Sequence, residues 1–230
     1  MKPTVLLFDI DGTLITTGGA GRRAMERAFL VSHGRADALA AIRLDGMTDR
    51  LIARLGLEAI GANDSEAAID ALLEAYLGVL ADEVARVDEG KYRLHLGMGA
   101  AIDAATDRGC AVGLGTGNLR KGAQVKLERV GVWHRFAFGG FGDDHEDRAA
   151  LIRRGAERGA ESLGVPLHAA RVVIIGDTPK DVAAAQAMGA QSIGVGTGGF
   201  TAEQLIAAGA TFAFDHLAAD GAIAALLDGL

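Results

Sequence analysis

The sequence predicts an α/β fold in which an open, doubly wound parallel sheet carries an inserted α-helical subdomain. Mostly apolar runs at residues 5–8, 111–114 and 172–175 are typical of strands buried on both faces of a parallel sheet. From residue 97 onward such strands alternate with helical patterns, as in βαβ units. The gap between the first two strands is far longer than one crossover helix requires, so we expect an insertion there.

The first strand ends in charged residues. Asp9 and Asp11 follow it directly, and Gly12 and Thr13 come next, where the backbone is expected to turn. Because alternate residues of an extended chain point the same way, the two carboxylates can share a face while Ile10 packs behind them. Two like charges this close need a cation or a proton between them, and a hard metal such as Mg2+ suits carboxylate oxygens.

The inserted segment is predicted to be helical. Apolar residues recur at helical spacing at residues 21–32, at 50–57 and, after a capping signal at Asn63 and Asp64, as far as 87. Such stripes are typical of core packing between helices. We therefore assign residues 1–15 and 93–230 to the sheet-containing core and residues 16–92 to a helical subdomain.

The remaining segments complete the alternation of strands and helices. Helices are predicted at residues 98–108, 121–130, 149–163, 179–188 and 201–208. Strands are predicted at residues 110–115, 136–139, 172–175, 191–195 and 211–214, the last as an edge strand. Thr201 with Gln204 has the spacing of a capping box at the start of the last predicted helix.

Composition excludes several classes of protein. A chain of 230 residues with 50% hydrophobic residues can bury a sizeable core without disulfides, and its single Cys110 cannot form an internal one. The formal charge of -7 argues against a general nucleic-acid-binding or anionic-membrane surface. No apolar run approaches the length of a membrane span, and no signal-peptide pattern precedes the first strand. We expect a cytoplasmic protein without nucleic-acid or membrane partners, as a monomer or homodimer.

Polar residues follow three of the predicted strands. Asp9 and Asp11 follow the first, a Thr116-Gly117-Asn118 turn follows the second, and Asp177 and Asp181 follow the strand at 172–175. The carboxyl ends of parallel strands face one crevice, so these residues are expected to converge there. Together they offer a metal site, a hydroxyl and amide cradle for an anion, and a nucleophile beside an acid.

This set of motifs resembles the phosphatase branch of the haloacid dehalogenase superfamily. The FDIDGT sequence at residues 8–13 resembles the first motif, which implies that Asp9 is a nucleophile and Asp11 a general acid and base. Thr116 resembles the second motif, whose hydroxyl holds the transferring phosphoryl group. Asp177 and Asp181 resemble the acidic pair that completes a Mg2+ site with Asp9 and the Asp11 carbonyl. The resemblance also implies a Rossmann-like core and a mobile helical cap formed by the insertion.

The third motif of the superfamily is where the sequence departs from the pattern. A lysine usually begins the helix after the third strand, whereas here Arg148 is the best-placed cation and Lys180 is its main competitor. Arg148 can neutralise a nucleophile and phosphoryl oxygens as lysine would, with a planar fork that can bind two oxygens. The predicted phosphate- or substrate-binding residues are Gly12, Thr13, Thr48, Gly117, Asn118 and Lys180. Thr48 belongs to a loop at residues 46–50 that resembles the specificity loop of such caps, and Arg22, Arg23 and Arg43 are nearby candidates for a second substrate anion.

The resulting hypothesis is a Mg2+-dependent phosphomonoester hydrolase that acts through an aspartyl phosphate. Its substrate is expected to be a small phosphorylated metabolite, by analogy similar to phosphoglycolate. A sugar phosphomutase of the same superfamily is the first alternative, because it would use the same acids. A non-enzymatic phosphate-binding module is the alternative of another class. Asp11 argues against a dehalogenase, which has no alcohol to protonate.

Overall fold

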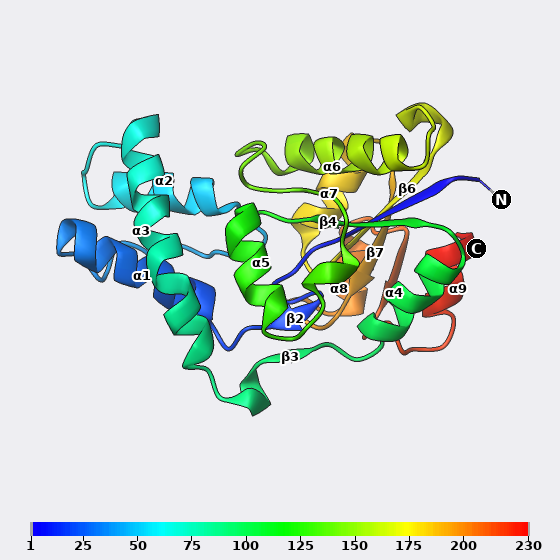
Figure 1. The fold of residues 1–230 in the computed structure, drawn as a ribbon, viewed down its shortest axis with the longest axis horizontal. Helices are drawn as coiled ribbons and strands as arrows, with labels where there is room; N and C mark the ends of the chain where they lie inside the picture. The colour runs from blue at the N-terminus through cyan, green and yellow to red at the C-terminus, as the bar shows by residue number, and fades with distance from the viewer. Residues whose placement is uncertain (1, 230) are drawn as a thin grey trace.

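The computed structural model describes residues 2–229 and has the predicted α/β architecture, a six-stranded sheet with helices on both faces (Figure 1). Its strand order is β5-β4-β1-β6-β7-β8, and every neighbouring pair is parallel. The six strands are β1 (Thr4–Phe8), β4 (Ala111–Gly115), β5 (Gly139–Gly140), β6 (Arg171–Gly176), β7 (Gln191–Val195) and β8 (Phe212–Phe214). The adjacent strands β4, β1 and β6 are followed by the predicted site residues Thr116 to Asn118, Asp9 and Asp177.

The helices follow the predicted order. They are α1 (Ala20–His33), α2 (Asp49–Ala59), α3 (Glu66–Ala85), α4 (Met98–Asp107), α5 (Arg120–Glu128), α6 (Arg148–Ser162), α7 (Pro179–Ala187), α8 (Ala202–Ala207) and α9 (Ala222–Asp228). Short 3-10 turns lie at η1 (Glu89–Lys91), η2 (Trp133–Arg135) and η3 (Leu167–Ala169). No helix of the described residues is long and apolar enough to cross a membrane.

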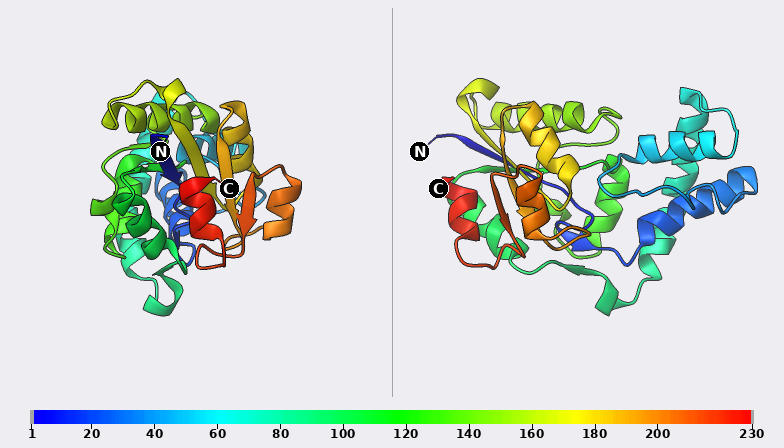
Figure 2. Two further views of the ribbon diagram at one scale, coloured as in Figure 1. Left: turned by 90° about the vertical axis from the view of Figure 1, so that its right-hand side faces the viewer. Right: turned by 180° about the vertical axis from the view of Figure 1, so that it is seen from behind.

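The inner strands of the sheet are buried on both faces, and most of their residues are apolar. Along β1, Val5 and Leu7 pack with α6 and α7, whereas Leu6 and Phe8 face the opposite cluster, which includes residues of α4, α5 and α9. All four side chains are fully buried. The end view in Figure 2 shows helices on both sides of the strands. This arrangement explains the continuous apolar runs in the sequence.

The inserted helices lie beyond the carboxyl ends of the strands, away from both termini (Figure 1). Within this group α3 packs along α1 and also contacts α2. Gly56 in α2 allows a close contact with α1, since a Cβ there would lie 2.3 Å from the Phe29 ring. A glycine inside a helix lowers the stability of the helix by about 1 kcal/mol relative to alanine. The packing of Phe29 explains why a glycine is nevertheless present here.

Three features of the chain differ from the prediction or were missed. The two crossings between the core and the insertion pair as an antiparallel ribbon, β2 (Ile15–Thr16) with β3 (Arg93–Leu94), which is too short to give a periodic signal. The helix α9 was not predicted. The strand expected at 136–139 is wrong in position, because η2 ends next to Phe136 and pairing with β4 begins only at Gly139.

Glycines in β5 set the position of α6. A Cβ on Gly140 would lie 1.9 Å from the Leu151 carbonyl oxygen, and one on Gly155 would lie 2.7 Å from the Gly140 nitrogen. The helix therefore packs directly on the strand backbone. This close approach brings Arg148, the first residue of α6, to the carboxyl end of the sheet.

Candidate active site

Three buried carboxylates gather at the carboxyl ends of β1 and β6. Asp9, Asp177 and Asp181 each offer an oxygen within 4.8 Å of the others, and all three residues are at most 5% exposed. Asp9 and Asp177 directly follow their strands, while Asp181 lies in the first turn of α7. The structure thus brings together three of the four predicted acidic residues in one cluster.

Gly12 and Thr13 shape this cluster by contacting Asp177. The Thr13 hydroxyl donates to Asp177 Oδ1 at 2.8 Å, and the Thr13 side chain is fully buried. Gly12 has a φ of +81°, and a Cβ there would lie 2.4 Å from Asp177 Oδ2. A residue with a side chain would be both strained and obstructed at this position. Gly12 lines the cavity described below, whereas the hydroxyl of Thr13 is already engaged with Asp177.

Asp181 is held by the start of α7 as well as by the site. Its Oδ2 accepts from the Thr178 backbone nitrogen at 3.0 Å and from the Thr178 hydroxyl at 2.8 Å, which completes a capping box. Its Oδ1 accepts from Arg148. With both oxygens engaged, Asp181 is placed to orient Arg148 and to add negative charge to the cluster.

Arg148 is the cation at this cluster. Its Nη2 lies 3.0 Å from Asp9 Oδ2, its Nε donates to Asp181 Oδ1 at 3.0 Å, and its side chain is 9% exposed. Lys180 is exposed and does not line the main cavity. Of the two cations considered from the sequence, only Arg148 lies against Asp9.

The raised pKa values of two of the clustered acids indicate that the site favours a bound cation or proton. Burial raises the pKa of Asp9 to about 6, against the opposing effect of Arg148 and with a smaller contribution from Asp181. Burial, followed by the charges of Asp181 and Asp9, raises the pKa of Asp177 to about 8. Three carboxylates beside one guanidinium leave two negative charges, which one divalent cation would balance. An all-oxygen, buried donor set of this kind fits a hard ion such as Mg2+.

Asp11 points to a different set of partners. Its Oδ2 accepts from Lys126 Nζ at 2.6 Å and from Asn118 Nδ2 at 2.8 Å, and its Oδ1 accepts from the Thr17 hydroxyl at 3.3 Å. Partial burial alone would raise the pKa of Asp11, but Lys126 and these hydrogen bonds hold it below its usual range. Asp11 is therefore kept as a well-oriented carboxylate beside the cavity.

Lys126 is the functional candidate that sequence reasoning missed. It is 3% exposed, lies on α5, and also donates to Asn118 Oδ1. A signal was present, because Lys126 follows Gly122 at i+4 on the face of α5 that is otherwise buried and apolar. A lysine at such a position needs an acidic partner, and here that partner is the half-buried Asp11.

Thr116 and Asn118 belong to the hydrogen-bond network around Asp11 and Lys126. The Thr116 hydroxyl is fully buried and accepts from Asn118 Nδ2 at 2.9 Å. Gly117 and Asn118 line the cavity, while Thr116 lies behind them. A Cβ on Gly117 would lie 2.3 Å from the Met47 carbonyl oxygen, so this glycine allows a close approach of the inserted segment to the core.

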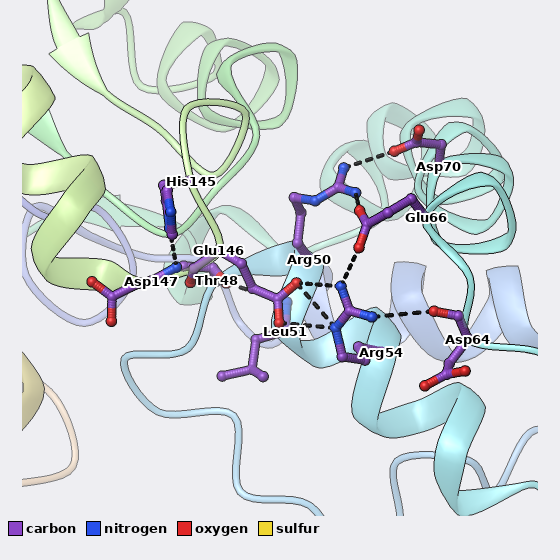
Figure 3. Close-up of polar contacts among 10 residues, drawn as sticks. All are labelled: Thr48, Arg50, Leu51, Arg54, Asp64, Glu66, Asp70, His145, Glu146 and Asp147. Atoms are coloured by element: carbon purple, nitrogen blue, oxygen red, sulfur yellow. Dashed lines mark hydrogen bonds and ion pairs between the residues drawn. The ribbon is translucent and has the colours of Figure 1, made fainter.

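Contacts at residues 48–54 join the inserted helices to the core (Figure 3). The Thr48 hydroxyl caps α2 and donates to the Glu146 carbonyl oxygen at 3.0 Å, so Thr48 lies at this junction and outside the cavity. Arg54 Nη2 binds Glu146 Oε2 at 2.9 Å. Asp49 is a second candidate residue that the sequence analysis did not identify. Its carboxylate accepts a hydrogen bond from the Leu119 backbone nitrogen at 2.8 Å. Burial raises the pKa of Asp49 to about 6.

The acids open onto a cavity of about 640 Å³ between the strand ends and the inserted helices. Asp9, Asp11, Asp177 and Arg148 line its core side. The volume is that of a small-molecule site. The arrangement can hold a cation and an anionic group next to the Asp9 carboxylate, with the Asp11 carboxylate nearby.

A profile of haloacid dehalogenase-like hydrolases matches residues 3–189. The chain belongs to this hydrolase family. The match spans the first strand, the inserted helices and the Asp177 and Asp181 motif. It confirms the family expected from the sequence motifs, as well as the α/β fold that accompanies it.

Several solved structures share this fold over nearly the whole chain. CbbY from Rhodobacter sphaeroides in complex with phosphate has a TM-score of 0.73 and 20% identity, with 98% of this chain and 99% of that chain covered. A hydrolase from Pseudomonas syringae has a TM-score of 0.68 and 20% identity, covering 93% and 94%. A predicted phosphoglycolate phosphatase from Haemophilus somnus has a TM-score of 0.66 and 16% identity, covering 95% and 96%. A comparison with curated protein sequences finds no match.

Proposed function

We propose that this hydrolase is a Mg2+-dependent phosphatase that cleaves small phosphate monoesters through an aspartyl phosphate on Asp9. The observation that carries the proposal is the buried cluster of Asp9, Asp177 and Asp181 with Arg148 3.0 Å from Asp9. A carboxylate nucleophile, a compensating cation and an acidic metal site are the parts that phosphoryl transfer requires. CbbY has also been solved with xylulose-(1,5)bisphosphate, a small phosphorylated ligand.

In the first step, an Asp9 oxygen attacks phosphorus in line and the bond between phosphorus and the ester oxygen breaks. Asp11 first takes up a proton from solvent, against the lowering of its pKa by Lys126, and then gives that proton to the departing alcohol oxygen. In the second step a water oxygen attacks the phosphorus of the acyl phosphate, Asp11 takes its proton, and inorganic phosphate leaves with Asp9 restored. Arg148 and the Gly117-Asn118 turn are the groups proposed to hold phosphoryl oxygens in both steps.

Asp9, the Asp11 carbonyl and Asp177 are the groups proposed to hold Mg2+, with Asp181 supporting from behind. When bound, this ion supplies positive charge that screens the nucleophile from the phosphoryl group.

We also propose that residues 16–92 act as a cap on a core of residues 1–15 and 93–230. The β2 and β3 ribbon is the only pair of covalent crossings between these parts. The contacts of Thr48, Asp49 and Arg54 with the core support a docked arrangement over the cavity. Docking of this kind would exclude bulk water from the reacting atoms.

Removal of divalent cations should abolish activity, because no ion would then screen the Asp9 carboxylate from the substrate phosphate. Activity on p-nitrophenyl phosphate should disappear in excess chelator and return with Mg2+. We expect Mn2+ to replace Mg2+ and Ca2+ to inhibit, since its larger coordination shell disturbs in-line geometry. Full phosphate release in excess chelator would contradict the metal assignment. A requirement for a bisphosphate activator, with no net phosphate release, would instead indicate a phosphomutase.

Asp11→Asn should slow esters with poor leaving groups more than aryl esters, because an aryl oxide departs without a proton. We expect a loss on the order of 100-fold or more for an alkyl phosphate and a smaller loss for p-nitrophenyl phosphate. Pre-steady-state formation of the phosphoenzyme isolates the step concerned. Equal losses for both esters in that step would contradict the role of Asp11 as an acid.

Lys126→Met provides a second arm of this experiment. Lys126 contacts Asp11 and Asn118 but none of the three clustered acids within hydrogen-bond distance. If it orients Asp11, its loss should produce the same bias against alkyl esters. Thermal unfolding serves as a control: the Asp11 side chain is 40% exposed, so loss of this half-buried pair should cost less than the roughly 3–5 kcal/mol of a fully buried one.

A further inference from the structure

The part of the cavity that lies away from Asp9 is formed by the inserted helices and is largely apolar. Its apolar lining comes from α1, from the loop before α2 and from α2 itself: Met25, Ile42, Leu44, Met47 and Ile52. In the proposed reaction this region faces the alcohol part of the ester, because the phosphoryl group is held at the strand ends. A wall of this composition favours carbon-based groups over charged ones.

The cations that line the cavity are already paired within the protein. Arg148 and Lys126 are engaged with the acids of the site, as described above. Arg22 Nε binds Glu26 at 2.9 Å, and its Nη2 donates to the Leu39 carbonyl oxygen at 2.7 Å. The Arg43 side chain is 81% exposed and lies 3.4 Å from Asp45. All four side chains have a carboxylate partner; the Arg43 pair is exposed and therefore weak, so Arg43 is the least committed of the four.

The net charge of the residues that line the cavity also shows no surplus of positive charge. Five carboxylates and four cations line the cavity; the carboxylates are Asp9, Asp11, Asp45, Asp49 and Asp177. A bound divalent cation would bring the total to one positive charge. The negative charge of the phosphoryl group of a monoester is already larger than that single positive charge. A second anion on the substrate would enter a partly buried site without compensation, which is unfavourable.

Tyr76 supplies the neutral polar group of this region. Its side chain, from α3, is 1% exposed and lines the cavity, and no described residue hydrogen-bonds its hydroxyl. Burial and the charges of Asp49 and Asp11 raise its pKa well above 10, so the hydroxyl stays neutral. A hydroxyl that lines a cavity without a protein partner is expected to find one in a ligand or water.

We propose that the cavity selects phosphate monoesters of uncharged alcohols and that the Tyr76 hydroxyl hydrogen-bonds an oxygen of the alcohol part. This inference rests on the proposed phosphatase function and specifies its substrate class. Phosphoglycolate, whose carboxylate is a second anion, is a poor substrate on this argument, in contrast to the analogy drawn from the sequence. The same reasoning excludes bisphosphates as preferred substrates.

Matched pairs of esters that differ by one charged group test the selection. We would compare glycerol 3-phosphate with 3-phosphoglycerate, and 2-hydroxyethyl phosphate with phosphoglycolate, using the Mg2+-loaded full chain. The uncharged member of each pair should have a kcat/KM at least about tenfold higher, the equivalent of about 1.4 kcal/mol. A preference of that size for the charged members, lost in Arg22→Gln, would overturn the proposal and identify Arg22 as an anion receptor.

Tyr76→Phe tests the role of the hydroxyl without changing the shape of the ring. It should raise KM for glycerol 3-phosphate about two- to tenfold, leave kcat nearly unchanged, and have no effect on propyl phosphate, which lacks a hydroxyl. Equal KM values for wild type and variant on glycerol 3-phosphate would overturn the role of Tyr76. Absence of phosphate release from every ester, including p-nitrophenyl phosphate, would instead refute the phosphatase function itself.

Discussion

Asp9→Asn should abolish turnover while the protein remains folded. The amide has nearly the shape of the carboxylate but lacks the charge and the nucleophilic oxygen that the proposed first step requires. Loss of a nucleophile commonly costs about 10⁴-fold or more in rate. We therefore expect no steady-state phosphate release above background and no phosphoenzyme after acid quench of a reaction with labelled substrate.

The fold of the Asp9→Asn variant should be unaffected or slightly stabilised without metal. In the folded protein, burial raises the pKa of Asp9 to about 6, which means that its charged form is disfavoured at neutral pH relative to the unfolded chain. A neutral amide removes that cost and can still accept a hydrogen bond from Arg148. The melting temperature of the metal-free variant should equal or exceed that of the wild type.

Asp103→Asn is the matched control for this experiment. Asp103 lies on α4, its side chain is 65% exposed, and it pairs with Arg135 outside the cavity. This variant should retain wild-type turnover and phosphoenzyme formation. Repeated turnover by Asp9→Asn at a rate near that of this control would refute the nucleophile assignment.

Arg148→Ala should lower kcat by a factor on the order of 10 to 1,000, as is typical when one preorganised charge donor is removed. The guanidinium lies 3.0 Å from Asp9 Oδ2 and is almost completely buried, so solvent cannot replace it. Arg148→Lys should restore part of the rate, because it returns the charge without the planar fork that reaches Asp9 and Asp181 together. Rates should be measured at saturating Mg2+ on protein shown to be folded.

Two control variants test whether a loss of activity is specific to Arg148. Arg158→Ala removes an arginine from the same helix, where Arg158 binds Asp144 at 2.7 Å and does not line the cavity. Lys180→Ala removes the competing cation, which is exposed. Both variants should turn over at close to the wild-type rate. An active Arg148→Ala beside an inactive Lys180→Ala would reassign the role to Lys180.

The strands and the acids were predictable because each depends on local sequence. A strand buried on both faces must be apolar throughout, and β1 and β6 end where Asp9 and Asp177 interrupt that pattern. The parallel arrangement then requires that these ends meet. The family expected from the same motifs is confirmed by the match over residues 3–189. The short ribbon of β2 and β3 and the two-residue β5 escaped prediction because elements of that length carry no periodicity.

What the sequence determined by itself was which elements form and which side chains stand at the strand ends, since periodicity and polarity are properties of neighbouring residues. Only the tertiary structure decided between Arg148 and Lys180 beside Asp9, because that choice depends on how closely α6 packs on the glycines of β5. It also decided that Lys126 meets Asp11, two residues 115 positions apart. Contacts of this kind arise from packing between elements, and no local pattern in the chain encodes their distances.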